Sequence, residues 1–467
     1  MIAFCTAATR YWRTLLLAAV VAAAPLLLGS AAWAQGNPTG NASALRLIKI
    51  IPVPPTPQNA VGAMFSFDIS WVDPANGLYY LGDRSNGAID VVDTTGAFTG
   101  KGPDTFFGQI GGFVGDTGAS TSSGPDGVVS GTSGGITCIF GGDGNSTLKS
   151  FSSANFTKIV SNVSTGGTKR VDEMAVDVAD GLVLAANNAD DPPFSTLFTY
   201  NKTTCALSNP IKTAFTSLPG GHTNTNGIEQ PAWDPTTKRF YVSLPEIDGP
   251  GDGTGITGAV ARINTSGTIE TVYPINYCQP AGLTLGPNGD LLVGCNSVFG
   301  LDGKKCSNLV ASPAPTTVPP QPVGHPTTCS GVAFPQSAIC NPGRGCTGNS
   351  LLSVPGAGGG DEVFFNAGDG NYYVTAGNDP KGPLFGVVAS GANTLQPNTL
   401  TQVVPTLSPI PAVLPATAKN QHQAGTVHSI AAGGGNAHVY LPLPANNAYN
   451  LNGANCTTGC IAVFSAQ

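Results

Sequence analysis

The sequence predicts an all-β protein, a single β-propeller with seven blades, and three observations support this fold class. A strand–turn–strand pattern recurs along the chain, as it does in repeat architectures. Gly and Pro contribute 62 and 38 of the 467 residues, and only 10% of the residues are charged. Such a chain has many turn residues and few straight-chain helix formers, which favours many short strands over helices.

Residues 1–34 are predicted to be a cleavable secretory signal. Arg10 and Arg13 precede an apolar run over residues 15–28, and Ala32-Trp33-Ala34 places small residues where a signal peptidase reads them. The rival interpretation is a membrane anchor, but the run is shorter than the roughly 20 residues that cross a bilayer. The mature protein is therefore expected to begin near Gln35 and to be secreted or periplasmic.

The repeated unit is clearest over residues 67–92, which read as a strand, a turn at Pro74-Ala75-Asn76-Gly77, a second strand and a third strand. Copies of this pattern begin near residues 127, 173, 231, 280, 362 and 428, and the copy near 127 is the weakest. One short sheet cannot bury both of its faces, so neighbouring sheets must stack, and a closed ring leaves no exposed end. Seven blades are predicted, or six if the copy near 127 is misread.

The N-terminal strand at residues 45–51 is predicted to close the ring. It precedes the first full copy, whereas the last copy ends at residues 460–464 with a third strand that lacks an outer partner. We expect the N-terminal strand to be that partner. A double-sheet sandwich or a parallel β-helix is the competing fold, but the copies recur too far apart for the coils of a β-helix.

Residues 35–467 are thus predicted to form one propeller domain, interrupted at about residues 301–350. This stretch is rich in Pro and Thr, contains four Cys and shows little alternation of apolar and polar residues. It is interpreted as a disulfide-held insertion between blades five and six.

The charge balance excludes nucleic acid as a partner. Loss of the signal removes Arg10 and Arg13 and no acid, which takes the formal charge from −7 to −9 (−7 − 2). Binding to phosphate backbones needs clustered Lys and Arg, and the sequence has no such cluster. No stretch after residue 34 is long and apolar enough to span a membrane.

The cysteine pattern predicts disulfides. Ten of the 11 Cys lie after the signal, and they can all pair in an oxidising compartment. A turn at residues 287–289 brings Cys278 near Cys295 across a hairpin, and the pairs Cys340 with Cys346 and Cys456 with Cys460 close small loops. Irregular spacing and only five His make a zinc site the minor alternative.

Polar residues are predicted to converge at one mouth of a central channel. In a propeller, the innermost strand of each blade starts on the face to which the second strand returns. Residues before the inner strands therefore gather at one rim, and here they are Asp68, Asp172, Glu173, Glu229, Gln279, Asp361, Glu362 and His428. Residues after the second strands reach the same rim, and these are Asp83, Arg84, Asn187, Asn188, Glu246, Asn296, Asn378, Asp379, Asn446 and Asn447.

Two interpretations of this rim remain open. Loops use Asp, Asn and Gly to satisfy backbone groups, which requires no ligand. Alternatively, the rim is a Ca²⁺ site or a polar ligand cup, because a hard cation takes about six to eight oxygens from several segments. The candidate metal ligands are Asp68, Asp172, Glu229, Asp361 and Glu362. The candidate ligand-binding residues are Asp83, Gln279, Asn296 and Asn378.

Residues 68–93 resemble a blade of the regucalcin, gluconolactonase and strictosidine synthase group of propellers, and residues 280–289 resemble another. The first similarity rests on Asp68, Trp71-Val72-Asp73-Pro74, the run from Asn76 to Tyr80, Asp83, Asn86-Gly87 and Asp93. The resemblance implies a divalent cation held at the channel mouth by a Glu, an Asn and an Asp, and hydrolysis of lactones or phosphoesters. This chain has Asp68 where the Glu is expected, Ala281 where the Asn would lie and Cys295 near the expected Asp.

Two functions follow from these observations. The first is a non-enzymatic extracytoplasmic propeller that binds a small molecule, a peptide or a protein partner at its polar mouth. The second is a metal-dependent lactonase or esterase, in which Ca²⁺ or another divalent cation polarises a carbonyl and His428 or Glu173 takes the proton. A structural role for His428 is the alternative. The sequence leaves open whether the protein is an enzyme.

Two glycine motifs are predicted to be structural. Residues 131–135 fit the nucleophile-elbow pattern G-x-S-x-G, but strands on both sides indicate a hairpin. Residues 253–258 fit G-x-G-x-x-G without the following helix of a dinucleotide site, which indicates a loop. Asp248 and Asp252 are similar in type to calcium-loop ligands, without the remaining ligand spacing.

Overall fold

The computed structural model describes residues 45–306, 328–347, 351–358, 360–376, 383–391, 399–406, 414, 418, 427–433 and 437–466. The predicted signal at residues 1–34 and its cleavage site lie outside this part of the chain. Residues 36–467 belong to one compact unit. The description below concerns this unit alone.

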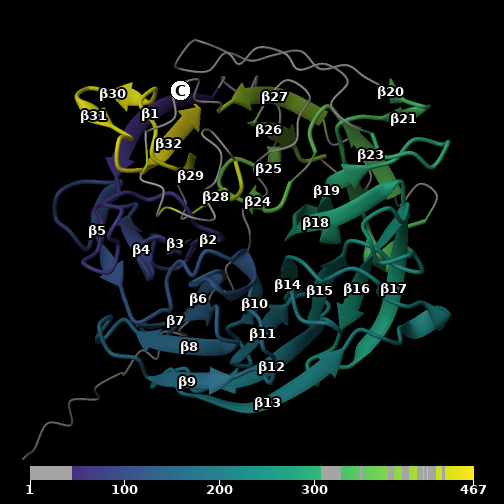
Figure 1. The fold of residues 1–467 in the computed structure, drawn as a ribbon, viewed down its shortest axis with the longest axis horizontal. Coiled ribbons are helices and arrows are strands. Elements are labelled where there is room, and N and C mark those ends of the chain that lie inside the picture. The colour runs from purple at the N-terminus through teal and green to yellow at the C-terminus, as the bar shows by residue number, and fades with distance from the viewer. Residues whose placement is uncertain are drawn as a thin grey trace, which may run out of the picture. The chain divides into compact units, whose positions relative to one another are not determined.

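The described strands of the ring form five four-stranded antiparallel sheets and one eight-stranded sheet, in which a single parallel pairing of Thr257 with Cys278 joins two antiparallel groups of four. We call the resulting seven groups blades one to seven (Figure 1). Blade one has β2 (Ser70–Val72), β3 (Leu78–Asp83), β4 (Ala88–Asp93) and β5 (Thr105–Ile110). Blade two has β6 (Val128–Ser133), β7 (Ile136–Asp143), β8 (Thr147–Ser152) and β9 (Ser161–Ser164). Blade three has β10 (Met174–Asp177), β11 (Leu182–Asn187), β12 (Phe194–Tyr200) and β13 (Leu207–Ala214).

The remaining blades follow in chain order. Blade four has β14 (Pro231–Asp234), β15 (Arg239–Leu244), β16 (Thr257–Ile263) and β17 (Ile269–Asn276). Blade five has β18 (Cys278–Leu285), β19 (Leu291–Val298), β22 (Gln336–Cys340) and β23 (Leu351–Pro355). Blade six has β24 (Val363–Asn366), β25 (Asn371–Ala376), β26 (Leu384–Ala389) and β27 (Thr399–Pro405). Blade seven has β28 (Ala431–Ala432), β29 (His438–Leu443), β32 (Cys460–Ala466) and β1 (Leu45–Pro52).

Short elements decorate the blades. Two small hairpins are built from β20 (Thr328–Cys329) with β21 (Val332–Ala333) and from β30 (Asn450–Leu451) with β31 (Ala454–Asn455). Four single-turn 3₁₀ helices occur at η1 (Ser120–Ser122), η2 (Pro219–Gly221), η3 (Pro287–Gly289) and η4 (Pro342–Arg344). No helix in the described part of the chain has the length and apolarity needed to cross a membrane.

The predicted β-propeller is confirmed by how the sheets meet. The innermost strands contact one another in a cycle that runs β2, β6, β10, β14, β18, β24, β28 and back to β2. Apolar clusters fill the spaces between neighbouring blades; between blades three and four, for example, Leu184 and Leu197 pack with Phe240 and Val242. Each blade is thus apolar on both faces, so its stability depends on both neighbours.

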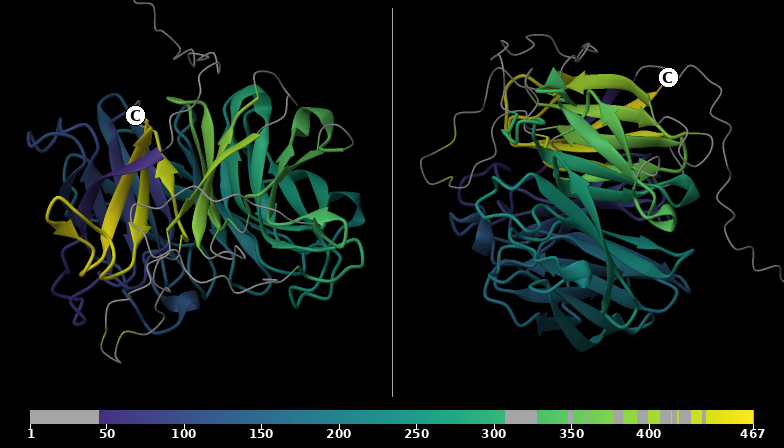
Figure 2. Two further views of the ribbon diagram at one scale, coloured as in Figure 1. Left: turned by 90° about the horizontal axis from the view of Figure 1, so that it is seen from above. Right: turned by 90° about the vertical axis from the view of Figure 1, so that its right-hand side faces the viewer.

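The N-terminal strand closes the last blade, as the sequence predicts. β1 pairs antiparallel with β32, in a register that joins Leu45 to Ala466 and Pro52 to Cys460. Figure 2 shows purple β1 beside yellow β32, although the two strands come from opposite ends of the propeller sequence. The outer position of blade seven is therefore supplied by the start of the domain.

The predicted position of the Cys- and Pro-rich insertion, between blades five and six, is wrong. Gln336–Cys340 pairs with β19 and Leu351–Pro355 pairs with Gln336–Cys340, so these segments are the third and fourth strands of blade five. The interruption thus lies inside blade five, between its second and third strands. The sequence did not reveal these two strands, because they contain few residues typical of strands and lie in or beside a Pro-rich stretch.

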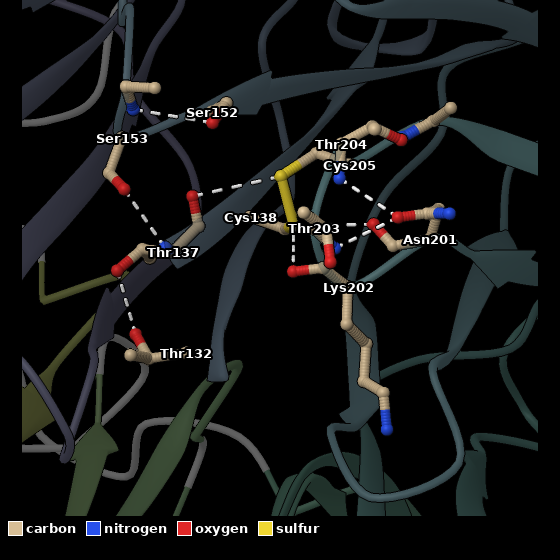
Figure 3. The surroundings of a disulfide bond; sticks show 12 residues. Thr132, Thr137, Cys138, Ser152, Ser153, Asn201, Lys202, Thr203, Thr204 and Cys205 are labelled. Carbon is tan, nitrogen blue, oxygen red and sulfur yellow. Dashed lines mark hydrogen bonds between the residues drawn. A yellow bond between two sulfur atoms is a disulfide. The ribbon is translucent and has the colours of Figure 1, made fainter. Parts of the chain in front are cut away.

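All ten Cys after residue 34 are paired. The three pairs expected from the sequence, Cys278–Cys295, Cys340–Cys346 and Cys456–Cys460, are present. Cys306–Cys329 closes the interruption within blade five, and Cys138–Cys205 joins β7 of blade two to the β12–β13 turn of blade three. Figure 3 shows this last bond, which links neighbouring blades covalently.

Candidate functional site

Four acidic residues occupy one repeated backbone position, two residues before an inner strand. The amide of Asp68 donates to Gly82, that of Asp126 to Gly142, that of Asp172 to Ala186 and that of Glu229 to Ser243, at 2.8–2.9 Å. Each donation is the first link between the inner strand and the second strand of its blade. Because the inner strands are neighbours in a cycle, the same position in successive blades brings these acids together.

A glycine allows two of these positions to approach closely. A Cβ atom on Gly127 would lie 1.8 Å from the carbonyl oxygen of Asp172, a distance that no side chain can occupy. Gly127 follows Asp126 directly, so its lack of a side chain lets the backbones of blades two and three meet beside their acids.

We call the ionisable groups gathered here the mouth cluster, and its members are Asp68, Arg84, Asp126, Arg170, Asp172, Glu173, Glu229, Asp361 and His428. Arg84, almost fully buried, forms ion pairs with both Asp68 and Asp126. Burial raises the pKa of Asp126 to about 7, in spite of the guanidinium beside it. Arg84 thus neutralises acids from two blades that would otherwise repel each other in a low-dielectric environment.

Arg170 extends this pairing to blade three. Its guanidinium lies 2.6 Å from Asp172 and 3.5 Å from Asp68, measured between nitrogen and oxygen atoms. Its Nε also donates to Asn188 at 3.4 Å. Two arginines therefore stand among the acids of blades one, two and three.

His428 is held between two carboxylates. Its Nε2 atom lies 2.5 Å from Asp68 and 3.0 Å from Asp361. Burial opposes ionisation of Asp361, but the neighbouring His428 lowers the pKa of that carboxyl below its ordinary value. Both carboxylates are thus within hydrogen-bond distance of the same nitrogen, so Nε2 is already engaged by the protein. This geometry favours a positioning role for His428 over the predicted proton acceptor.

Glu173 and Glu229 differ from the other acids of the mouth cluster. Together with Asp172 they place carboxylate oxygens within 4.8 Å of one another. Among the described residues, neither glutamate forms an ion pair, and the Oε2 atom of buried Glu173 has no hydrogen-bond partner. Burial and the neighbouring carboxylates raise the pKa of Glu229 to about 8 and that of Glu173 well above its ordinary value. Near neutral pH these two glutamates are therefore driven toward their protonated, neutral forms, because no cationic side chain of the described residues forms an ion pair with them.

Glu362, predicted as a metal ligand, is instead bound to the backbone of two other blades. Its Oε2 atom accepts hydrogen bonds from the Ser70 amide of blade one at 3.3 Å and the Ile430 amide of blade seven at 3.2 Å. The Ser429 hydroxyl also donates to it. Burial raises the pKa of Glu362 to about 8. Its carboxyl therefore ties three inner strands together, and Oε2 is occupied.

Gln230 likewise binds the backbone of two other blades, on the other side of the cycle. Its Oε1 atom accepts from the amides of Leu283 in blade five at 2.7 Å and Val363 in blade six at 3.1 Å. Gln230 and Glu362 both stand immediately before an inner strand, one residue after the position of the acids. In blades four and six, the two adjacent positions before the inner strand thus serve different purposes. In blade three, by contrast, both Asp172 and Glu173 belong to the mouth cluster.

The three predicted ligand-binding residues that the structure describes do not join the mouth cluster. Asp83 is buried within blade one, where it hydrogen-bonds Asn86. Gln279 donates to the carbonyl of Gly255 at 2.9 Å, and Asn296 is exposed near the end of β19. Asn378 lies outside the described residues. Of the predicted metal and catalytic residues, Asp68, Asp172, Glu173, Glu229, Asp361 and His428 do converge.

The residues do not fit the metal site that the family resemblance implies. Asp68 is engaged by Arg84 and His428, Ala281 has no ligand atom, and Cys295 is bonded to Cys278. Three acids of blades three and four offer a better donor set than these positions. The positions that bind the metal in the regucalcin group therefore do not supply a set of metal ligands in this chain.

The sequence analysis predicted no role at the site for three members of the mouth cluster, namely Arg84, Asp126 and Arg170. Asp126 could have been found, because Asp126-Gly127 precedes β6 as Asp68 precedes β2. Arg84 was placed at the rim but given no role. Arg170 precedes Asp172 in a loop, and no repeat signal marks it.

The Gly-rich loop at residues 249–255 surrounds an acid of its own chain. Glu246 is buried, and its carboxylate accepts amide hydrogen bonds from Gly251, Gly253 and Gly255 at 2.6–3.1 Å. A cradle of backbone N–H groups binds an anion, and here the anion is internal. The predicted structural loop is thus confirmed, and the G-x-G-x-x-G pattern marks no phosphate site.

Surface hollows lie elsewhere. One is lined by residues that include Gln58, Asn86 and Gln109, and another by residues of β13 and the β16–β17 turn. Neither includes a residue of the mouth cluster, and neither gathers ionisable side chains in its lining. The convergent charges, rather than the hollows, therefore identify the candidate site.

Comparisons with known proteins support the fold. No family model matches the chain, and no curated protein matches it. Among solved structures, the chain is similar to Kuenenia stuttgartiensis hydrazine synthase, with a TM-score of 0.54 and 10% identity over 88% of this chain and 97% of that one. At this identity the likeness concerns the fold alone. It supports a β-propeller, and the closer relationship to the regucalcin group stays a prediction.

Proposed function

We propose that this protein is an extracytoplasmic β-propeller that binds a divalent cation at the mouth cluster, as part of a polar ligand-binding site. The observation that carries the proposal is an asymmetry of pairing. Asp68, Asp126 and Asp172 each form an ion pair with an arginine and Asp361 contacts His428, whereas Glu173 and Glu229 form no ion pair among the described residues. A bound cation would supply the missing charge.

The donor set suits a hard divalent cation. Asp172, Glu173 and Glu229 come from two neighbouring blades, and carboxylate oxygens are preferred ligands of Ca²⁺ and Mg²⁺. Glu173 offers an oxygen, Oε2, to which no group of the described residues hydrogen-bonds. All three side chains stand one or two residues before the inner strands β10 and β14, which fixes where they leave the backbone.

The extracytoplasmic location is supported by composition and covalent structure. Five disulfides are compatible with an oxidising compartment. The predicted signal at residues 1–34 would direct the chain there. Ligand binding, rather than catalysis, is the proposed role because the Nε2 atom of His428 is engaged by two carboxylates.

Cation binding is expected to depend on Glu173. Titration of the purified protein with CaCl₂ and with MgCl₂ in a calorimeter should reveal one site. The change Glu173→Gln keeps the shape of the side chain and removes one negative ligand, so affinity should fall by about tenfold or more. Thermal unfolding of the variant would verify that it folds.

Asp252→Asn is the matched control, since Asp252 is an exposed acid of the Gly-rich loop outside the mouth cluster. This variant should bind the cation as the wild type does. Absence of binding in the wild type, or equal affinity in the wild type and Glu173→Gln, would contradict the proposal. A panel of lactones, assayed with and without EDTA, tests the alternative hydrolase, which predicts turnover that EDTA abolishes.

A further inference from the structure

Three phenylalanines form a row on the outer part of blades one and two, away from the mouth cluster. Phe98 lies in the loop between β4 and β5, Phe107 in β5, and Phe156 in the loop between β8 and β9. The strands β5 and β9 are the outermost strands of these neighbouring blades (Figure 1). The ring centroids are 6.0 Å apart for Phe98 and Phe107, and 5.7 Å apart for Phe107 and Phe156. We call these three side chains the phenylalanine ridge.

The ridge exposes aromatic surface to solvent. Phe98 is 46% exposed and Phe107 is 36% exposed, whereas Phe156 packs partly against the core between blades one and two. They are the two aromatic side chains among the exposed large apolar residues of the described chain, and their rings are in contact. Single exposed apolar residues are common on protein surfaces, but contiguous ones on two blades indicate an interaction surface.

Hydrogen bonds fix the loop that carries Phe98. Asp93, the last residue of β4, accepts from the amides of Gly96, Phe98 and Thr99, each at 2.8 Å. The loop is therefore tied to the end of its own strand. An aromatic side chain on such a loop loses little conformational freedom when it meets a partner, which lowers the entropic cost of binding.

The surroundings of the ridge are basic. Lys101 and Lys158 are exposed in the same two loops, and the ammonium group of Lys49 donates to the carbonyl of Pro103 at 2.8 Å. Residues 94–110 and 153–160 contain one acid, Asp104, which is buried and bonded to Tyr440. The whole chain has 27 acidic and 20 basic residues, so the charge of this surface is opposite to that of the protein.

Two other occupants fit these features less well. The rings meet edge to face, with interplanar angles of 61° and 79°, so they form no flat platform on which successive sugar rings could stack. A second copy that bound symmetrically through the ridge would bring Lys101 and Lys158 close to their own counterparts, and like charges repel. The combination of apolar rings and lysines instead complements a surface that is apolar inside and anionic outside.

We propose that the phenylalanine ridge docks the propeller on a lipid bilayer with anionic headgroups. The rings enter the interface between headgroups and acyl chains, where burial of apolar surface is favourable. Lys101 and Lys158 lay their methylene stems along this interface and place their ammonium groups beside the lipid phosphates. This contact lies on the outer strands and does not depend on cation binding at the mouth cluster.

The test is flotation of the purified protein, without the apolar residues 1–34, with lipid vesicles in the presence of EDTA. One set of vesicles contains phosphatidylcholine alone, and the other contains phosphatidylcholine and phosphatidylglycerol in equal parts. The wild type should bind the anionic vesicles more tightly. Phe98→Ser should lower its partition coefficient by about tenfold, because the exposed part of one ring no longer inserts. Lys101→Gln and Lys158→Gln should each lower it by about fivefold.

Two matched variants outside the ridge serve as controls. Ile211 on β13 is 45% exposed, nearly as much as Phe98, and Lys238 is an exposed lysine of blade four. Ile211→Ser and Lys238→Gln should bind the anionic vesicles as the wild type does. All these variants change surface side chains, and thermal unfolding would verify that they fold.

Three results would overturn lipid docking. The first is that the wild type floats with neither set of vesicles, or equally with both. The second is that Phe98→Ser binds the anionic vesicles as tightly as the wild type. The third is a wild-type dimer in light scattering that Phe98→Ser converts to a monomer, since the ridge would then be the contact between two copies of this chain.

Discussion

Replacing Glu362 with Ala is expected to destabilise the protein by about 3–5 kcal/mol, because it leaves three buried donors of two other blades without an acceptor. The carboxyl of Glu362 accepts from the amides of Ser70 and Ile430 and from the hydroxyl of Ser429, and all these groups are buried. Few single side chains in this chain join so many inner strands. Chemical denaturation monitored by tryptophan fluorescence would measure the loss.

Glu362→Gln is the matched control for this prediction. Its amide oxygen can accept the same hydrogen bonds, and Glu362 itself is largely protonated near neutral pH because burial raises its pKa to about 8. We therefore expect a change of less than about 1 kcal/mol at pH 6. A loss as large as that of Glu362→Ala would show that the hydrogen bonds to the three inner strands are not the cause.

The pH dependence of stability gives an independent reading of Glu362. Its pKa is raised in the folded state, so its contribution is complete below the ordinary value of 4.5 and is lost as the pH rises to about 8. Glu362→Gln has no proton to lose at this site. The free energy of unfolding should therefore fall less steeply with pH in Glu362→Gln than in the wild type, and parallel curves would contradict the assignment.

Replacing Arg84 with Met is expected to cost about 3–5 kcal/mol, since removal of one partner leaves buried charges uncompensated. Arg84 is almost fully buried and pairs with two acids, Asp68 and Asp126, from different blades. Met retains much of the apolar stem, so the loss reports mainly on charge. Equilibrium unfolding in urea would measure it.

Two further variants test the cause of that loss. Adding Asp68→Asn and Asp126→Asn to Arg84→Met removes the orphaned charges and should recover much of the stability. Arg239→Met removes the partly exposed ion pair with Glu270 and should cost less than about 1 kcal/mol. If Arg84→Met were as mild as Arg239→Met, the ion pairs of the mouth cluster would not hold the inner strands together.

The candidate site was only partly visible in the sequence, and the reason is geometric. The repeat pattern located the acids before inner strands, because those positions are local to each copy. It did not reveal that two adjacent residues can face different surroundings. Asp361 joins the mouth cluster, whereas the next residue, Glu362, accepts hydrogen bonds from backbone amides. In blade six, the direction of the side chain therefore decides whether an acid joins the mouth cluster or binds the backbone of other blades.

The positively charged partners of these acids were equally hard to predict from the sequence. Arg170 has no place in the repeat, yet its guanidinium contacts acids of blades one and three. The partners of an ion pair are chosen by proximity in space, and here they are separated by up to 102 residues in sequence (170 − 68). Asp83 illustrates the opposite case: its position at the end of a second strand predicts the rim, but its side chain is buried inside blade one and accepts a hydrogen bond from Asn86.

The sequence by itself determined the all-β class, the repeated sheets, closure by the N-terminal strand and three of the five disulfides, because each depends on patterns that are local or repeated along the chain. Only the tertiary structure decided which acids are neutralised, which are left without a counter-ion and which bind backbone. Those outcomes depend on distances between blades, where burial and charge act through space rather than along the chain.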